Sequence, residues 1–371
     1  MKIGILKEVE GDKRVALLPG NVKTLLQLNV EVLIEESAGF SAYFSDQQYR
    51  EAGAGVKTGK EVMQEADLLI RINPFTREEL ASLDGGKALL SIFNPLNNRD
   101  LINDATNQGL TTISLDMIPR STRAQSMDVL SSMATTAGYK AVIDAANHLP
   151  GFFPMFMTAA GTIRPAKILI LGAGVAGLQA IATARRLGGV VEAFDVRSTV
   201  KEEVQSLGGK FIEVEGAREA KDSGGYAVEQ TEEFKQKQKQ LIHDHAIKSD
   251  VIITTAQIPG KQAPLLVQKD TVEQMRPGSV IVDLAASSGG NCALTRNKEN
   301  VEHNGVTIIG KSNYPSELPA DASKMFGNNL INFLKLIIDK EGNMQLNLED
   351  DIIKNACITH EKQIINERLK N

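Results

Sequence analysis

The sequence has only two cysteines, Cys292 and Cys357, in 371 residues. Two thiols cannot build a disulfide framework, and they form no Cys/His spacing typical of a metal site. An excess of charge of one sign is missing too, because the net charge is only −5 and no basic patch occurs. A mildly acidic chain of this kind argues against binding to nucleic acid or to a lipid surface. We therefore expect no metal and no nucleic-acid partner.

Long hydrophobic runs are missing as well. The longest uncharged stretch covers residues 168–184, which is slightly short for a membrane span and is interrupted by glycines and Gln179. The chain begins with a strand-like segment at residues 2–6 and shows no signal peptide. The sequence thus predicts a cytoplasmic protein that does not insert into the membrane itself.

Strand-like apolar runs alternate with helix-like segments along the chain. In the N-terminal half a helix that opens with proline covers residues 19–28, and the runs cover 2–6, 30–34, 66–72, 88–92 and 111–114. In the C-terminal half they lie near Ile168, Val190, Phe211, Val251, Val280 and Val306. Strands separated by helices predict parallel, doubly wound sheets.

A chain of 371 residues is long enough for about two domains. We expect an α/β fold in which two Rossmann-like, doubly wound parallel-sheet domains flank a nucleotide cleft. The first domain covers residues 1–135 and the second covers 136–319, with a connecting helix at 134–149. A helix over 320–340 and the tail to 371 should pack back on the first domain.

A glycine motif in the second domain predicts a dinucleotide site. A buried strand at 167–171 leads into a turn and helix with glycines at Gly172, Gly174 and Gly177, and a second strand ends in Asp195. Gly172 permits the tight turn, Gly174 lets the backbone approach a pyrophosphate, and Gly177 lets the helix pack close to the sheet. Asp195 can accept hydrogen bonds from both ribose hydroxyls and would repel a 2′-phosphate. The motif therefore favours NAD(H) over NADP(H).

A polar stretch at 215–240 breaks the regular α/β spacing. It contains the pair Gly224-Gly225 beside Tyr226 and a run of alternating lysine and glutamine. Loops of this length inside a compact domain are uncommon, and many of them are lids or binding loops. A hinged lid and a disordered insertion followed by a solvated helix both fit, although the glycine pair beside a tyrosine favours the lid.

An unusual polar cluster lies just before the connecting helix. Residues 119–132 combine Arg120, Arg123, Gln125 and Asp128 with several serines. Taken with the motifs at 157–162, 172–177, 224–226, 254–260 and 283–292, the cluster closely resembles the NAD(H)-binding component of proton-translocating nicotinamide nucleotide transhydrogenase. The resemblance runs in order over about residues 1–340 and is much more specific than the glycine motif. The absence of membrane spans matches the separate soluble alpha subunit of enzymes with a split alpha chain.

Alanine dehydrogenase is the close relative of that family and needs a separate test. Amino-acid dehydrogenases carry a lysine and a histidine in the first domain, because making and hydrolysing an imine requires proton transfer. Here the lysine-like stretch at 70–74 holds Arg71, the histidine-like stretch at 91–95 holds Asn94, and no histidine precedes His148. Ser287-Ser288 also stand where that family has an acid. The proton carriers of amino-acid chemistry are therefore missing.

Hydride transfer between two nicotinamides has no such requirement. No oxygen or nitrogen gains or loses a proton, so no general acid or base is needed at the reacting carbons. The protein must hold the two rings face to face, about 3–3.5 Å apart, and exclude water. A polar cluster that orients a carboxamide is sufficient for this task.

The resemblance implies a catalytic loop at Arg120, Gln125 and Asp128. Gln125 would reach toward the second nucleotide, Asp128 would fix the carboxamide, and Arg120 would hold the loop. Ser131 and Tyr139 occupy family positions beneath the loop and complete the catalytic set. Without the resemblance, a solvated loop with an internal Arg–Asp pair is the simpler interpretation. The rest of the loop comprises Ser121, Thr122, Arg123, Ser126 and Met127.

The remaining cofactor positions also follow from the resemblance. They are Val175, Val196, Arg197, Gly225, Tyr226, Gln238 and Gln257. Arg197 can suggest NADP(H), although the family combines this arginine with NAD(H) and Asp195 should dominate. Gln257 stands where the family often has an apolar residue, so its contact is undefined.

The resemblance implies partners beyond this chain. NAD(H) would bind here and NADP(H) on a partner subunit, while membrane-spanning partner chains would translocate protons and hold a homodimer of this chain at the inner membrane. Two alternatives remain: a self-sufficient amino-acid dehydrogenase and a non-catalytic NAD-binding module. Assays with pyruvate, ammonia and NADH distinguish the dehydrogenase from the other two.

Overall fold

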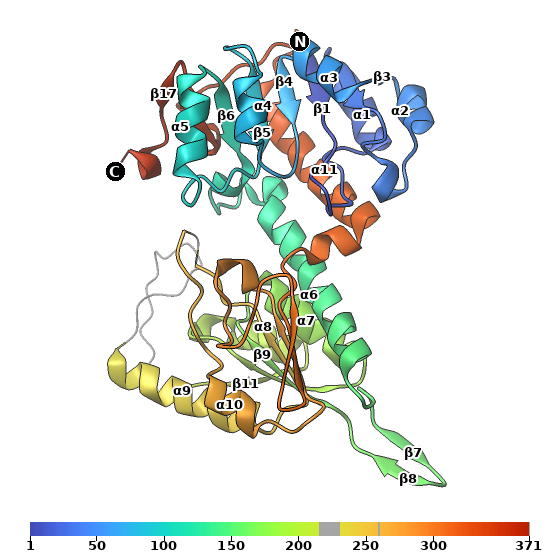
Figure 1. Ribbon diagram of the computed structural model, residues 1–371, viewed down its shortest axis with the longest axis vertical. Helices are drawn as coiled ribbons and strands as arrows, with labels where there is room; N and C mark the ends of the chain where they lie inside the picture. The colour runs from blue at the N-terminus through green and yellow to red at the C-terminus, as the bar shows by residue number, and fades with distance from the viewer. Residues whose placement is uncertain (215–230, 259, 371) are drawn as a thin grey trace. The chain divides into compact units, whose positions relative to one another are not determined.

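The computed structural model describes residues 1–214, 231–258 and 260–370. The chain forms two compact units, one of Met1–Met133 with Pro315–Asn371 and one of Ala134–Tyr314. Both units are α/β, as expected from the sequence, and each holds a predominantly parallel sheet (Figure 1). Among the described residues, no helix is long and apolar enough to cross a membrane.

The sheet of the first unit is parallel except at one edge. Its order is β17-β16-β6-β5-β4-β1-β2-β3, so strand β1 lies between β2 and β4. The chain therefore reverses its direction of winding between β1 and β4. The strands are β1 (Lys2–Ile5), β2 (Glu31–Glu35), β3 (Gly55–Lys57), β4 (Leu68–Ile70), β5 (Ala88–Ser91), β6 (Thr111–Ser114), β16 (Cys357–His360) and β17 (Gln363–Ile364).

Two apolar cores cover the two faces of this sheet, because successive strand residues point to opposite sides. Ile3, Val32 and Ile70 join one core, and Leu33 and Leu69 join the other. The first core is completed by α1 (Pro19–Leu26), α11 (Pro319–Ile337) and α12 (Asp351–Ala356). The second is completed by α3 (Gly59–Glu65), α4 (Arg77–Ala81) and α5 (Arg99–Asn107), while α2 (Asp46–Ala52) packs against α1.

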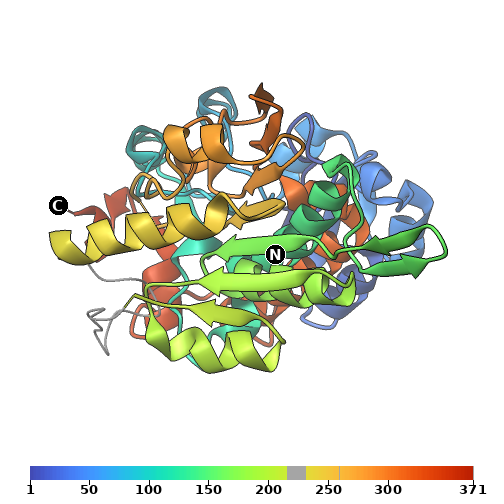
Figure 2. The same ribbon diagram turned by 90° about the horizontal axis from the view of Figure 1, so that it is seen from below.

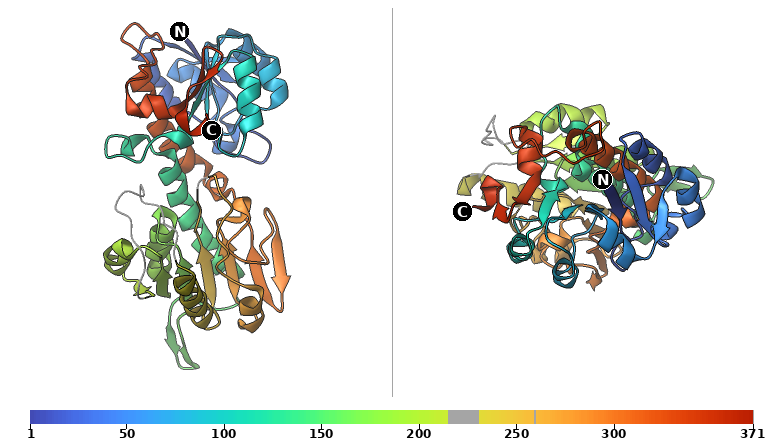
Figure 3. Two further views of the ribbon diagram at one scale, coloured as in Figure 1. Left: turned by 90° about the vertical axis from the view of Figure 1, so that its left-hand side faces the viewer. Right: turned by 90° about the horizontal axis from the view of Figure 1, so that it is seen from above.

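Local sequence signals set the ends of several helices in the first unit. Pro19 opens α1, and Ser45, Thr58 and Thr76 form capping boxes at the starts of α2, α3 and α4. The C-terminal tail adds an element that the sequence pattern did not reveal. Strand β16 pairs antiparallel with β6, so the red C-terminal segment lies beside the cyan strands (Figures 1 and 3).

The second unit repeats the same winding. Its sheet has the order β11-β10-β9-β12-β13-β15-β14, with β14 antiparallel to β15 at the edge. The direction of winding reverses between β9 and β12. The strands are β9 (Lys167–Leu171), β10 (Val190–Phe194), β11 (Lys210–Ile212), β12 (Val251–Thr254), β13 (Val280–Asp283), β14 (Asn300–His303) and β15 (Val306–Ile309).

Helices cover both faces of the second sheet. The core on one face includes residues of α6 (Val129–His148), α7 (Val175–Arg186) and α8 (Lys201–Ser206). The core on the other face includes residues of α9 (Glu232–Ala246) and α10 (Lys269–Gln274). The polar stretch at 215–240 is therefore not a continuous loop, since its last residues belong to α9, where Thr231 caps the helix.

A β-hairpin projects from the second unit, away from its sheet (Figures 1 and 2). It consists of β7 (Phe156–Thr158) and β8 (Gly161–Ile163), which form a separate two-stranded sheet among the described residues. The remaining regular elements are short 3-10 helices: η1 (Phe40–Ala42), η2 (Leu115–Met117), η3 (Gln125–Met127), η4 (Ser198–Val200), η5 (Ala286–Ser288), η6 (Tyr314–Glu317) and η7 (Glu367–Leu369).

Candidate functional site

The glycine turn of the second unit lies between β9 and α7. Gly172 has a φ of +103°, a left-handed conformation that favours glycine. A Cβ on Gly177 would lie 1.9 Å from the carbonyl oxygen of Gly172, so the turn and the helix approach each other as closely as backbones can. Gly174 precedes the first residue of α7, and a Cβ there would meet nothing within 4 Å. The turn therefore packs tightly against the helix at Gly177 and is open at Gly174.

The turn stands at the reversal point of the sheet, between the carboxyl ends of β9 and β12. Ligands of open α/β sheets bind in the crevice outside such a point. Two neighbours fix the turn: the N–H of Gly172 donates to Phe194 O (2.8 Å), and the hydroxyl of Thr255 donates to Gly172 O (3.1 Å). The first N–H groups of α7 lack helical partners and point toward this crevice with the positive end of the helix dipole. This geometry suits a phosphate.

Asp195 follows β10 and is bound to the turn and to Arg197. Its Oδ2 accepts from Ala173 N (2.7 Å) and Arg197 Nη2 (2.8 Å). Its Oδ1 accepts from the backbone N and the Nε of Arg197, both at 2.9 Å. A carboxylate has about four acceptor positions, so Asp195 has none to spare. A ribose can bond to Asp195 only if Arg197 releases part of its fork.

The segment after β12 lies beside the glycine turn. Thr255 donates its backbone N–H to Leu171 O (2.8 Å), which places Thr255 and Ala256 directly beside the glycine turn. The exposed Gln257 donates its side-chain amide to Leu284 O (2.9 Å), after β13. Val175 is exposed at the start of α7, whereas Val196 is half-buried against the apolar core.

The polar loop at 120–128 belongs to the first unit, where α11 and α12 hold it. The carbonyl of Ser126 accepts from the side-chain amides of Asn329 (2.8 Å) and Asn332 (3.1 Å) on α11. Arg123 pairs with Asp350 and with Asp351 (3.0 Å) at the start of α12. A solvated loop with an internal Arg–Asp pair was the simpler interpretation of this loop. Arg123 instead pairs with aspartates of the C-terminal segment.

Individual side chains of this loop lie in different environments. Met127 is buried, Ser121 is half-buried, and Arg120, Thr122 and Gln125 are exposed. Asp128 accepts from Ser131 N (2.9 Å) and from the Ser131 hydroxyl (2.6 Å) at the start of α6. The loop is therefore anchored through its backbone, Arg123 and Met127, and it presents Gln125 outward.

Tyr139 lies farther along α6, in the second unit, and is 42% exposed. Its neighbour Gly138 packs on the nucleotide helix: a Cβ on Gly138 would lie 2.1 Å from Ala176 O. Gln238 is half-buried on α9, within a helix instead of a loop. Gly225 and Tyr226, and with them the lid hypothesis, lie outside the described residues. Over the described range, no group of three or more His, Cys, Asp or Glu could hold a metal ion.

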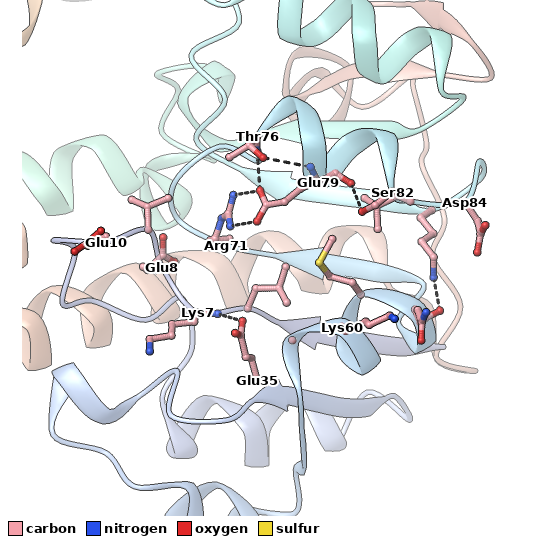
Figure 4. Close-up of a pocket in the computed structure, with 17 residues that line it drawn as sticks. Lys7, Glu8, Glu10, Glu35, Lys60, Arg71, Thr76, Glu79, Ser82 and Asp84 are labelled. Carbon is pink, nitrogen blue, oxygen red and sulfur yellow. Dashed lines mark hydrogen bonds and ion pairs between the residues drawn. The ribbon is translucent and has the colours of Figure 1, made fainter.

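A separate hollow of 610 Å³ lies in the first unit, between α3, α4 and the carboxyl ends of β1 and β2 (Figure 4). The guanidinium of Arg71 lies over the ring of Phe75 and makes two 2.8 Å hydrogen bonds to the carboxylate of Glu79. Arg71 belongs to the lysine-like stretch, and here it closes an ion pair. It cannot serve as a proton carrier, because an arginine stays protonated.

A buried acidic cluster adjoins the end of β4. The carboxylate of Glu8 accepts from Ile72 N (2.7 Å), Asn73 N (3.0 Å) and Asn73 Nδ2 (2.8 Å). Burial raises the pKa of Glu8 to about 7, against the opposing effect of these three donors. The neighbouring Asp12 pairs with Arg14. Burial alone would raise the pKa of Asp12, but the hydrogen bonds and the charge of Arg14 outweigh it and lower the pKa to about 2.

Comparisons with known proteins agree with this geometry. Two family models match almost the whole chain: "Alanine dehydrogenase/PNT, N-terminal domain" over residues 4–137 and "Alanine dehydrogenase/PNT, C-terminal domain" over 141–367. The chain is 45% identical to an NAD(P) transhydrogenase subunit alpha chain of Rhodospirillum rubrum, over 100% of this chain and 99% of that one. The chain belongs to the alanine dehydrogenase/PNT family, among its transhydrogenase alpha subunits.

Solved structures place the chain in the same way. A transhydrogenase from Sinorhizobium meliloti superposes with a TM-score of 0.90 at 42% identity, over 98% of this chain and 100% of that one. An L-alanine dehydrogenase superposes with a TM-score of 0.83 at 25% identity, over 100% and 98% of the two chains. The two groups share the fold, and the transhydrogenases are nearer in sequence. The family assignment made from the sequence motifs is confirmed.

Sequence reasoning missed several residues that build the crevice. Thr255, Asp283 and Asn291 received no role, although all three stand inside quoted motifs. The sequence did hold a signal for the last two. Asp283 ends a strand, and Gly289-Gly290-Asn291 follow a few residues later, a pattern typical of a turning loop.

Proposed function

We propose that this chain binds NAD(H) at the carboxyl end of the second unit's sheet and passes hydride to or from NADP(H) on a partner subunit. The observation that supports NAD(H) binding is the open Gly174 at the start of α7, flanked by Asp195. These features fit a dinucleotide, because the glycine turn and the start of the helix suit a pyrophosphate and the acid suits a ribose. When bound, NADH would supply the hydride.

The protein's own part in this reaction is placement. Asp128 would fix the nicotinamide carboxamide and Gln125 would reach toward the second nucleotide. The anchors of the loop through Ser126 and Arg123 limit its movement. Asp128 already bonds to Ser131, so it would share its carboxylate between Ser131 and the ligand. Arg120 would contact nucleotide or partner, and Tyr139 would support the site from α6. Positioning of this kind can account for large rate effects without proton transfer.

The surroundings of the first unit's strand ends support hydride transfer over amino-acid chemistry. Arg71 is held by Glu79, and no histidine occurs before His148. An imine mechanism would therefore lack the lysine and the histidine that carry protons in amino-acid dehydrogenases. We therefore prefer the transhydrogenase reaction to the alanine dehydrogenase reaction, even though the fold accommodates both.

The proposed reaction needs partner chains. The relatives are named as subunits, and an alpha subunit of a transhydrogenase implies an NADP(H)-binding subunit and membrane-spanning subunits. We propose that this chain is cytoplasmic and peripheral on the inner membrane through those partners, with proton translocation in the partner chains.

We also propose that the chain is a homodimer, with the β7–β8 hairpin in the interface. The hairpin and its base expose large apolar side chains: Phe152, Met155, Phe156, Met157 and Ile163, of which Met157 is 74% exposed. Such a concentration of exposed apolar groups marks an interaction surface. In a symmetric dimer, each copy would bury the hairpin of the other.

One experiment tests the proposed function as a whole. The chain is mixed with the NADP(H)-binding domain of a transhydrogenase, without membranes, and hydride transfer between the two nucleotides is followed. A parallel assay offers pyruvate, ammonia and NADH to the chain alone. We expect transfer in the first assay and none in the second. Rapid pyruvate reduction would establish an amino-acid dehydrogenase, and inactivity in both despite NADH binding would indicate a non-catalytic module.

A further inference from the structure

Asp283 organises the loop that follows β13. Its side chain is fully buried, and it accepts hydrogen bonds from the neighbouring strand β12 and from the loop itself. The donors are Thr254 Oγ1 (2.9 Å), Ala285 N (2.9 Å), Asn291 N (2.7 Å), Cys292 N (3.1 Å) and Thr295 Oγ1 (2.6 Å). A buried carboxylate with this many donors is rigidly held, because every oxygen is bonded. It fixes the backbone of Asn291.

The side chain of Asn291 binds both polar groups of one residue beside the crevice. Its Oδ1 accepts from Ala256 N (3.0 Å), and its Nδ2 donates to Ala256 O (2.9 Å). The second hydrogen of Nδ2 goes to Pro264 O (2.8 Å). Asn291 is fully buried, so these bonds are not shared with solvent. Only a carboxamide both accepts and donates in this arrangement.

Ala256 belongs to the β12 side of the crevice. A Cβ on Gly172 would lie 3.4 Å from Ala256 N, so Ala256 directly abuts the glycine turn. Thr255 ties the same segment to the turn through Gly172 O (3.1 Å). The chain of contacts from Asp283 through Asn291 to Ala256 is therefore a brace between the end of β13 and the wall of the crevice.

We propose that Asn291 is a positioning residue for the nicotinamide half of the dinucleotide. The inference rests on the proposed function, since it assumes NAD(H) in this crevice. In a doubly wound sheet, one mononucleotide-binding half covers β9, β10 and β11 and takes the adenosine, while the half that begins with β12 takes the other nucleotide. Asn291 holds the first residues after β12, where the second half begins.

Two ligands distinguish this role from general stability. NADH occupies both halves of the crevice and 5′-AMP only the adenosine half. Binding of each is measured on the intact chain carrying Asn291→Ser, Asn291→Gln or no change. We expect Asn291→Ser to raise the Kd for NADH at least about tenfold, as the loss of buried hydrogen bonds predicts, and to leave the Kd for 5′-AMP within about twofold. Asn291→Gln should give a smaller effect of the same kind.

Thr295→Val is the matched control. It removes one hydrogen bond to Asp283 in the same loop but none to Ala256. It should lower the melting temperature while leaving the ratio of the two dissociation constants unchanged. A merely structural role for Asn291 would give the same result in the Asn291 variants, with both ligands weakened equally or neither weakened, and would overturn the proposal.

Two further outcomes have defined meanings. If the unaltered chain binds neither NADH nor 5′-AMP, the proposed function fails before the role of Asn291 is tested. If the Asn291 variants do not fold, amide hydrogen exchange of the unaltered chain decides instead. The N–H of Ala256 should exchange slowly without nucleotide because Asn291 holds it, and fast exchange there would overturn the brace.

Discussion

The two units wind their sheets in the same order, but they differ in the connection from the first strand to the first helix. In the second unit, Gly172, Ala173 and Gly174 alone connect β9 to α7, so the helix starts at the sheet end. In the first unit, residues 6–18 separate β1 from α1. The start of α1 is therefore not a phosphate site at the reversal point. Winding order alone does not create a nucleotide site.

The strand next to the reversal point differs as well. In the first unit the N–H groups after β4, those of Ile72 and Asn73, are taken by the carboxylate of Glu8. In the second unit the N–H of Ala256, after β12, is taken by the neutral amide of Asn291. A carboxyl group of the chain itself thus occupies the first reversal point, whereas the second keeps its helix dipole available for an external anion. Each prediction below alters one side of this contrast.

The largest effect should come from the loop of the first unit. Gln125→Asn shortens a side chain that is exposed and not part of the anchors, so it should misplace the rings without weakening NADH binding. A displacement of about 1 Å can slow transfer on the order of 100-fold. The check is stopped-flow transfer with the NADP(H)-binding domain, beside a titration with NADH. Gln47→Asn, exposed on α2, is the control. An unchanged transfer rate would remove Gln125 from the site.

Breaking the turn of the second unit should instead affect binding. Gly177→Ala places a methyl group 1.9 Å from Gly172 O, and overpacking of this kind costs about 1–3 kcal/mol. We expect the Kd for NADH to rise about 5- to 150-fold, as a titration followed by NADH fluorescence or by calorimetry would measure. Gly20→Ala, in the first turn of α1 where a Cβ meets nothing within 4 Å, should leave binding unchanged. Equal effects of the two changes would contradict the assignment of the site to the second unit.

Asp195 and Arg197 should set the choice between NADH and NADPH. Asp195→Ala removes a charged acceptor, which typically is worth about 1.5–3 kcal/mol, and frees Arg197 for a 2′-phosphate. NADH binding should weaken about tenfold or more while NADPH binding improves. Arg197→Ala should sharpen the preference for NADH, because it leaves Asp195 uncompensated. Parallel titrations with both nucleotides measure this, and NADH binding unaffected by Asp195→Ala would refute the ribose assignment.

The smallest expected effect concerns the buried carboxyl group of Glu8 in the first unit. The pKa of Glu8 is raised to about 7, so the folded chain holds this proton more tightly than the unfolded chain. The resulting stability is fully present below about pH 4.5 and is lost as the pH rises through about 7. The free energy of unfolding should fall by about 1–3 kcal/mol between pH 5 and 8.

Urea denaturation at several pH values measures this dependence. Glu8→Gln should flatten it over the same range. Asp12 does not interfere, because its pKa is lowered to about 2 and its contribution is lost only in stronger acid. A pH dependence that persists in Glu8→Gln would assign it to another group.

The sequence was informative where one local pattern determines one local structure. The glycine turn, the alternating strands and the family resemblance depend on contiguous residues, and they predicted the α/β fold and the family. Contacts between distant segments could not be read in this way. The pairing of β16 with β6, the hold of Asn329 on Ser126 and the capture of Ala256 by Asn291 join residues far apart in the chain.

The fork of Arg197 on Asp195 shows another limit. Its residues are close in sequence and were both singled out, but only coordinates show that the carboxylate is fully bonded before any ribose arrives. A solvated helix around Gln238 was one of two open interpretations, because the lysine–glutamine run has no clear apolar period on which to recognise a helix.

The central claim is that this chain transfers hydride directly and without a proton carrier. NADH labelled with deuterium at its reactive carbon is mixed with the chain, NADP⁺ and an NADP(H)-binding domain of a transhydrogenase, and the product is analysed by mass spectrometry. The account predicts that the label is transferred to the NADPH product and that none appears in water. Label lost to solvent, or delivered to pyruvate by the chain alone, would contradict it.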